Sequence, residues 1–131
     1  MKTDEKELLL KDLSARLPYG VIVNITGFDF DFKDKLTQIY KAGYGCSIQV
    51  TNNMPYGIEQ VKPYLLPLSR LYNLDRPDFY NTMREVRDKK GNHIEYIWTL
   101  QTYEWLNENH YDYRGLIEKG LAIDATNKNI Y

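Results

Sequence analysis

The apolar positions change their spacing along the chain, and each change marks a predicted element. Near the start, leucines recur at helical spacing, and Pro18 ends the run because the residue before a proline is driven out of the α region. Asp4 followed by Glu7 resembles a capping box. We therefore predict an N-terminal helix between Asp4 and Pro18. Its apolar face consists of Leu9, Leu10, Leu13 and Leu17, with Leu8 at the border.

After Pro18, apolar and polar residues alternate, which is the pattern of half-buried strands. In the first run, Val21, Val23 and Ile25 share one face. The connections between the runs are too short for crossover helices, so we predict an antiparallel meander that ends at about residue 53. The predicted strands are 19–26, 36–41 and 46–51, with a turn region at 27–34.

The middle of the chain is harder to assign. Residues 55–72 contain Pro63 and Pro67, which exclude a regular helix, so we predict a short helical turn and then an extended or 3₁₀ segment that crosses the sheet. Two interpretations of residues 78–98 stay open. One is a helix capped by Asp75 and followed by a strand, and the other is a β-hairpin that turns at 89–92.

The C-terminal part is predicted to be helical. Thr99 is placed to cap a helix over 100–108, with Tyr103 and Leu106, joined by Leu100, facing inward. Asp112 is placed to cap a second helix over 113–119, which ends at a glycine, and the final residues 127–131 are expected to fray. The predicted fold class is α+β. It comprises a small antiparallel sheet of three or more strands, an N-terminal helix and two C-terminal helices packed against the sheet.

Composition narrows the class of protein. The 131 residues suit a single domain spanning 1–131, and 43% apolar with 27% charged residues is ordinary for a globular chain. The net charge of −1 gives no overall attraction to nucleic acid, although a local basic patch stays compatible with it. The chain has one cysteine and lacks the apolar run of a signal peptide or a membrane helix. We therefore expect a cytoplasmic protein.

Catalytic and metal-binding motifs are missing from the sequence. His93, His110 and Cys46 have no partners at metal-ligand spacing, and Cys46 falls in an alternating strand, where a structural cysteine is expected. No serine lies in a nucleophile elbow. The acidic run Asp29, Asp31 and Asp34 is better explained as a solvated turn than as a calcium loop. We expect no enzyme activity, no metal and no cofactor.

Aromatic residues make up 14% of the whole chain. Two segments, residues 62–72 and residues 109–115, combine aromatic with basic side chains. A helix N-terminus beside arginine attracts anions, and tyrosine can stack on a base. If the two segments meet, they form one ligand-binding pocket. In the alternative interpretation, Asp112 caps a helix, Arg114 pairs with an acid and the tyrosines pack on the sheet. The candidate ligand-binding residues are Lys62, Tyr64, Arg70, His110, Tyr113 and Arg114.

Three blocks of sequence resemble a group of short proteins from gut anaerobes and their phages and prophages. They are residues 7–21 (ELLLKDLSARLPYGV), 61–69 (VKPYLLPLS) and 105–122 (WLNENHYDYRGLIEKGLA). Leu66 stands where those proteins often carry arginine, which weakens an anion site at this segment. The group has no assigned activity. The resemblance implies only a mobile-element or host accessory protein that is small and non-enzymatic.

Together these features favour a non-catalytic binding module for a protein partner or a small anionic ligand such as a nucleotide. Homodimerisation through an aromatic face or a strand edge is a further expectation, whereas membranes and nucleic acid are not expected as partners. The alternative is a nucleic-acid-associated accessory protein. It would use a stripe of Arg84, Arg87, Lys89 and Lys90.

Overall fold

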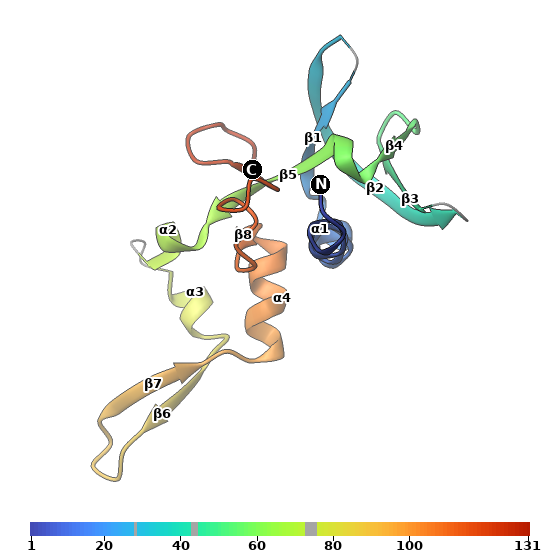
Figure 1. Ribbon diagram of the computed structural model, residues 1–131. Coiled ribbons are helices and arrows are strands. Elements are labelled where there is room, and N and C mark those ends of the chain that lie inside the picture. The colour runs from blue at the N-terminus through green and yellow to red at the C-terminus, as the bar shows by residue number, and fades with distance from the viewer. Residues whose placement is uncertain (28, 43–44, 73–75) are drawn as a thin grey trace.

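The computed structural model describes residues 1–131 except 28, 43–44 and 73–75, and excludes the side chains of 41–46. It mixes helices with a multi-stranded, mostly antiparallel sheet (Figure 1). The N-terminal helix α1 (Thr3–Arg16) is confirmed. Its cap differs from the prediction, because Lys2 precedes the first turn and its backbone N–H donates to Glu5 Oε1 at 3.0 Å.

A bent sheet follows α1 and its short 3₁₀ extension η1 (Leu17–Tyr19). The five main strands form an antiparallel meander whose last strand returns to pair with the first. Two short parallel strands, β8 (Tyr111–Asp112) and β9 (Ile123–Asp124), pair with β5 near its end. The main strands are β1 (Ile22–Thr26), β2 (Asp31–Ala42), β3 (Gly45–Val50), β4 (Pro55–Gly57) and β5 (Val61–Pro67), with a 3₁₀ turn η2 (Ile58–Gln60) before β5.

The predicted meander is confirmed, but its limits are wider than predicted. The prediction of a turn was wrong for residues 31–34, which belong to β2 and pair with β1. The proline-containing segment was expected to cross the sheet, yet it forms β5 within the sheet. Pro63 lies opposite Val23, where β5 has no paired strand on its other side, and a proline is tolerated at such an edge position.

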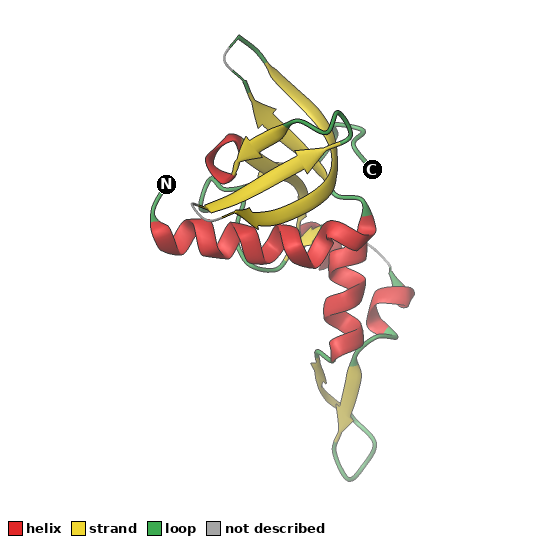
Figure 2. Cartoon of the chain, turned by 90° about the vertical axis from the view of Figure 1, so that its right-hand side faces the viewer, coloured by secondary structure: helices red, strands yellow, loops and turns green. Residues whose placement is uncertain are grey.

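One apolar cluster lies between α1 and the sheet. The helix crosses one side of the bent sheet (Figure 2), so that Leu9 and Leu13 meet the alternating face of β1, where Val23 and Ile25 are buried as predicted. Leu116, Leu121 and Ala122 from the C-terminal part complete this cluster.

A second apolar cluster lies beyond the end of β5. Phe79, fully buried, meets Trp98 and Trp105 at ring-centroid distances of 6.5 and 5.1 Å. Leu71, Leu106 and Tyr111 are the other buried members. The cluster is built by the helices α2 (Leu68–Tyr72), α3 (Pro77–Tyr80) and α4 (Leu100–Glu108).

The predicted C-terminal helices are only partly present. Thr99 caps α4 as expected, and Leu106 is buried, but Leu100 is 75% exposed because the apolar stripe of α4 faces the second cluster. Residues 113–119 form turns instead of a helix. Asp112 still caps this segment, since its carboxylate accepts from the N–H groups of Leu116 and Ile117 at 3.0 and 2.9 Å.

Residues 84–97 form a β-hairpin of β6 (Arg84–Arg87) and β7 (His93–Ile97), which settles the alternative left open by the sequence. The helical interpretation holds only for the single turn α3, and the proposed cap Asp75 falls outside the described residues. The hairpin projects away from the sheet in both views (Figures 1 and 2). Among the described residues, no helix is long and apolar enough to cross a membrane.

Candidate functional site

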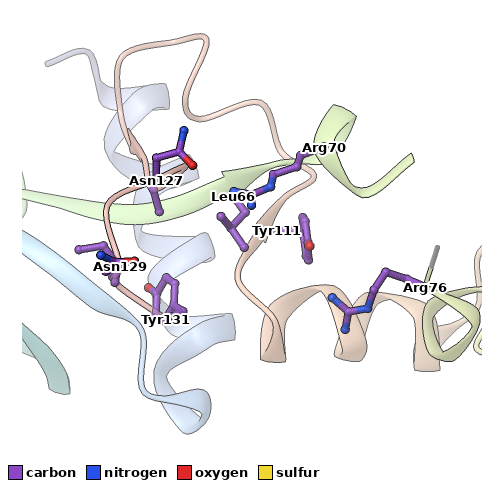
Figure 3. Close-up of a pocket in the computed structure, with 9 residues that line it drawn as sticks. Leu66, Arg70, Arg76, Tyr111, Asn127, Asn129 and Tyr131 are labelled. Atoms are coloured by element: carbon purple, nitrogen blue, oxygen red, sulfur yellow. The ribbon is translucent and has the colours of Figure 1, made fainter. Parts of the chain in front are cut away.

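A cavity of about 310 Å³ lies where the end of β5 meets the C-terminal segment. Figure 3 shows Arg70 and Tyr111 on one side of it and three residues of the C-terminal segment on the other. The parallel pairing of β5 with β8 and β9 brings these distant parts of the sequence together. The polar and aromatic lining residues are Arg70, Arg76, Tyr111, Asn127, Asn129 and Tyr131.

The two arginines of the cavity differ in their partners. Arg76 is held by Asp78 through two hydrogen bonds, at 3.2 and 3.0 Å, and its guanidinium lies 5.0 Å from the ring centroid of Trp105. Asp78 raises the pKa of Arg76 through these bonds. Half-buried Arg70 has no ion pair with any described residue. Arg70 is therefore the guanidinium available to an incoming anion.

Tyr131 anchors the C-terminal segment, which was wrongly expected to fray. Its hydroxyl accepts from the Ile22 N–H at 2.9 Å and donates to the Tyr64 carbonyl at 2.9 Å. Burial of this hydroxyl raises the pKa of Tyr131, although the residue as a whole is 50% exposed. The segment is thus fixed against β1 and β5, and part of the Tyr131 ring stays open to the cavity.

His110 supports the Tyr131 ring from behind. The two rings stack with centroids 4.0 Å apart and an interplanar angle of 16°. His110 is 6% exposed, and its Nδ1 has no hydrogen-bond partner among the described residues. Burial, assisted by the nearby positive charge of Arg16, lowers the pKa of His110 to about 4. His110 is therefore a neutral stacking partner at neutral pH and not a cation of the site.

The predicted residues of the β5 segment lie near the cavity. Arg70 lines it, whereas Tyr64 lies beside it, where its carbonyl accepts from Tyr131 and its own hydroxyl donates to Asn24 Oδ1 at 3.4 Å. Lys62 is exposed on the outer face of β5 and does not line this cavity. Of the six predicted residues, Arg70 alone contributes to the lining.

Arg114 and Tyr113 belong to a buried network and not to the cavity. Arg114 Nη1 donates to Asp12 Oδ1 at 2.7 Å, and its guanidinium lies 4.4 Å from the Tyr113 ring centroid. The Tyr113 hydroxyl donates to Asn107 Oδ1 at 2.9 Å. This arrangement matches the alternative interpretation, in which Arg114 pairs with an acid. The two basic-aromatic segments do meet, because β5 pairs with β8. The side chains of Tyr113 and Arg114, however, are used in internal packing.

Several lining residues carry no signal in the sequence. Asn127 and Asn129 adopt positive φ values of 61° and 54°, which asparagine tolerates better than most residues and which shape the path of the segment over the cavity. Their spacing follows no helix or strand period. The only available signal for Tyr131 was a large aromatic residue in a tail otherwise rich in polar residues.

The described residues offer no metal site as an alternative to this cavity. Among the described residues, no group of three histidine, cysteine, aspartate or glutamate side chains is arranged to hold a metal ion. The side chain of Cys46 falls outside the described residues, so its predicted burial stays a prediction. The sequence matches no family model, and searches of curated proteins and of solved structures also gave no match.

Proposed function

We propose that this protein is a non-catalytic binding module that holds a small anionic ligand in the cavity beside β5. The observation that carries the proposal is Arg70, a half-buried guanidinium without an ion pair among the described residues, at a cavity of about 310 Å³. A volume at the lower end of the range for ligand pockets suits a small molecule. The mobile-element context implied by the sequence blocks belongs to the same proposal.

The lining favours a phosphate-bearing ligand with a planar ring, such as a nucleotide. Arginine binds phosphate through two parallel hydrogen bonds, and the amides of Asn127 and Asn129 can donate to or accept from a polar ring edge. One face of the Tyr131 ring is covered by His110, which holds the ring in place, and we expect a base to stack on its other face. Arg76 adds positive charge at the cavity, reduced by its pairing with Asp78.

The test is native mass spectrometry followed by isothermal titration with a panel of nucleoside monophosphates and cyclic nucleotides. Replacing Arg70 removes a charge-assisted contact of about 1.5–3 kcal/mol, so Arg70→Gln should weaken binding by about 10-fold to 100-fold. The matched control is Arg84→Gln, which removes the same charge from the exposed hairpin. Equal affinity in both variants would refute the assignment of the cavity.

A protein partner is the outcome to pursue if no nucleotide binds. The projecting hairpin and the start of α4 expose large apolar side chains, with Ile94 57% and Leu100 75% exposed. Such side chains on a projecting element are typical of interaction surfaces.

A further inference from the structure

The register of the sheet places cations from different strands side by side on its outer face. Lys33 of β2 and Lys62 of β5 both lie opposite Asn24 of β1, one on each side. Lys35 is two residues from Lys33 on the same strand, opposite Ile22. The neighbouring Val23 and Ile25 face the core, so the three lysines share the exposed face.

This face is continuous with the cavity beside β5. A second hollow, of about 280 Å³, is lined by Ile22, Lys33, Asp34 and Lys35 together with Asn129 and Ile130. Asn129 and Ile130 also line the first cavity. The anchored C-terminal segment therefore lies between the two hollows and joins them. We call the row formed by Lys33, Lys35, Lys62 and Arg70 the basic strip.

The cations of the basic strip slightly outnumber the acids around them. None of its four cations forms an ion pair with a described residue. Three acids lie near them: Asp31 on the same face of β2, Asp34 in the second hollow, and Asp124, whose pKa is lowered by hydrogen bonds from Thr126 and also by the charge of Arg70. A small local excess of positive charge therefore remains on this face.

The hairpin, which the sequence also suggested as a basic stripe, holds an ion pair between its own side chains. Arg87 pairs with Glu85 at 2.8 Å, and the carboxylate of Asp88 accepts from the turn N–H groups of Lys90 and Asn92. Glu95 adds a further negative charge on β7. The hairpin and the basic strip each hold four cations and three nearby acids, so net charge alone does not separate them. The basic strip is distinguished because its cations have no ion pair with a described residue and because it is continuous with the cavity.

We infer that the basic strip binds a single-stranded nucleic acid, with one nucleotide in the Arg70 cavity and the phosphates of its neighbours along the lysines. The inference rests on the proposed function, because the anionic ligand of the cavity would be one nucleotide of a longer single strand. Adjacent strands are about 4.8 Å apart, which places Lys33 and Lys62 roughly 10 Å from each other, and Lys33 and Lys35 roughly 7 Å apart. A flexible strand can follow such a row, and Tyr64 and Tyr131 provide rings for stacking.

The experiment is fluorescence anisotropy with labelled oligothymidylates and oligouridylates from dinucleotide to dodecamer, measured over a range of salt concentrations. Four phosphate contacts predict that log K falls with log salt at a slope of about −2.8, since each single-strand contact contributes about 0.7. The double variant Lys33→Gln/Lys62→Gln should reduce the slope by about 1.4 and weaken binding at low salt. The matched control Lys89→Gln/Lys90→Gln removes the same charge from the hairpin tip and should leave both unchanged.

The possible failures are distinguishable. Oligonucleotides that bind no tighter than a mononucleotide would overturn the inference, while an Arg70-dependent mononucleotide would keep the proposed function. Oligonucleotides that bind with no effect of Arg70→Gln would overturn both the inference and the assignment of the cavity, because Arg70 belongs to each. Equal losses in the two double variants, or equally tight binding of a polyglutamate peptide, would show a general charge effect and overturn the inference. Thermal melting of each variant confirms that it is folded.

Discussion

Asp12 is expected to be the most sensitive charged residue for stability. It is fully buried on α1, and its carboxylate accepts from Arg16 Nε at 3.0 Å and from Arg114 Nη1 at 2.7 Å. Arg16, also fully buried, donates to the carbonyls of Leu106 and Tyr111 at 3.3 and 2.6 Å. This network joins the N-terminal helix to α4, to β8 and to the residues that follow β8. Asp12→Asn keeps the size of the side chain and removes its charge.

The expected loss follows from the guanidinium that this substitution leaves behind. Removing one partner of a buried ion pair costs about 3–5 kcal/mol, because the other charge stays buried without compensation. The two carbonyls still accept from Arg16, and Arg114 can turn toward solvent, so we expect about 3 kcal/mol. This is a large fraction of the 5–15 kcal/mol that is typical for the unfolding of a domain.

Urea unfolding followed by tryptophan fluorescence measures this loss, because Trp98 and Trp105 lie in the second cluster. With a slope of about 1.5 kcal/mol per molar urea, Asp12→Asn should lower the midpoint by about 2 M. Glu59→Gln makes the same chemical change at the exposed pair with Lys6 and should leave the midpoint unchanged. A midpoint shift below about 0.5 M for Asp12→Asn would show that Arg16 is not left as an uncompensated buried charge.

Three further predictions concern stability. The pKa of His110 is lowered to about 4 in the folded protein, so between about pH 6.5 and pH 4 the unfolded chain binds one proton more than the folded chain. Acidification through this window should therefore lower the free energy of unfolding by up to about 3 kcal/mol. Urea midpoints at both ends of the window measure this; His110→Phe should reduce the loss, and a full loss in that variant would contradict the assignment. Phe79→Ala should cost about 3–5 kcal/mol by urea unfolding, and a loss below about 1 kcal/mol would show that the second cluster is loosely packed. Gly120 has a φ of +74° and open space around it, so Gly120→Ala should lower the free energy of unfolding by about 1 kcal/mol through backbone strain alone. An unchanged thermal melting temperature would contradict the left-handed backbone at this position.

The parts of the fold that were predictable are those with a local cause. Helical spacing and Pro18 indicated α1, and the alternation of Val21, Val23 and Ile25 identified the buried face of β1. Thr99 marked the start of α4 because its side chain accepts from a first-turn N–H. These patterns depend on neighbours within a few residues, so the sequence alone displays them.

The rest depends on contacts between distant residues. Pro63 favoured an irregular segment in the sequence, but β5 pairs with β1 and places Pro63 at an edge position where the missing N–H is tolerated. The helical spacing after Pro77 was outweighed by the pairing of β6 with β7. At the site, Arg70 was predicted from its local character, whereas Asn129 and Tyr131 line the cavity only because the tail folds back over β1.

Whether the cavity beside β5 binds an anionic ligand can be measured by ¹H–¹⁵N chemical-shift mapping with a nucleoside monophosphate. We expect shifts at the Arg70 side-chain Nε–H and at the backbone amides of Tyr111, Asn127, Asn129 and Tyr131, all lost in Arg70→Gln. The hairpin amides should not move. Shifts confined to the hairpin, or no shifts at a saturating concentration of ligand, would contradict binding at this cavity.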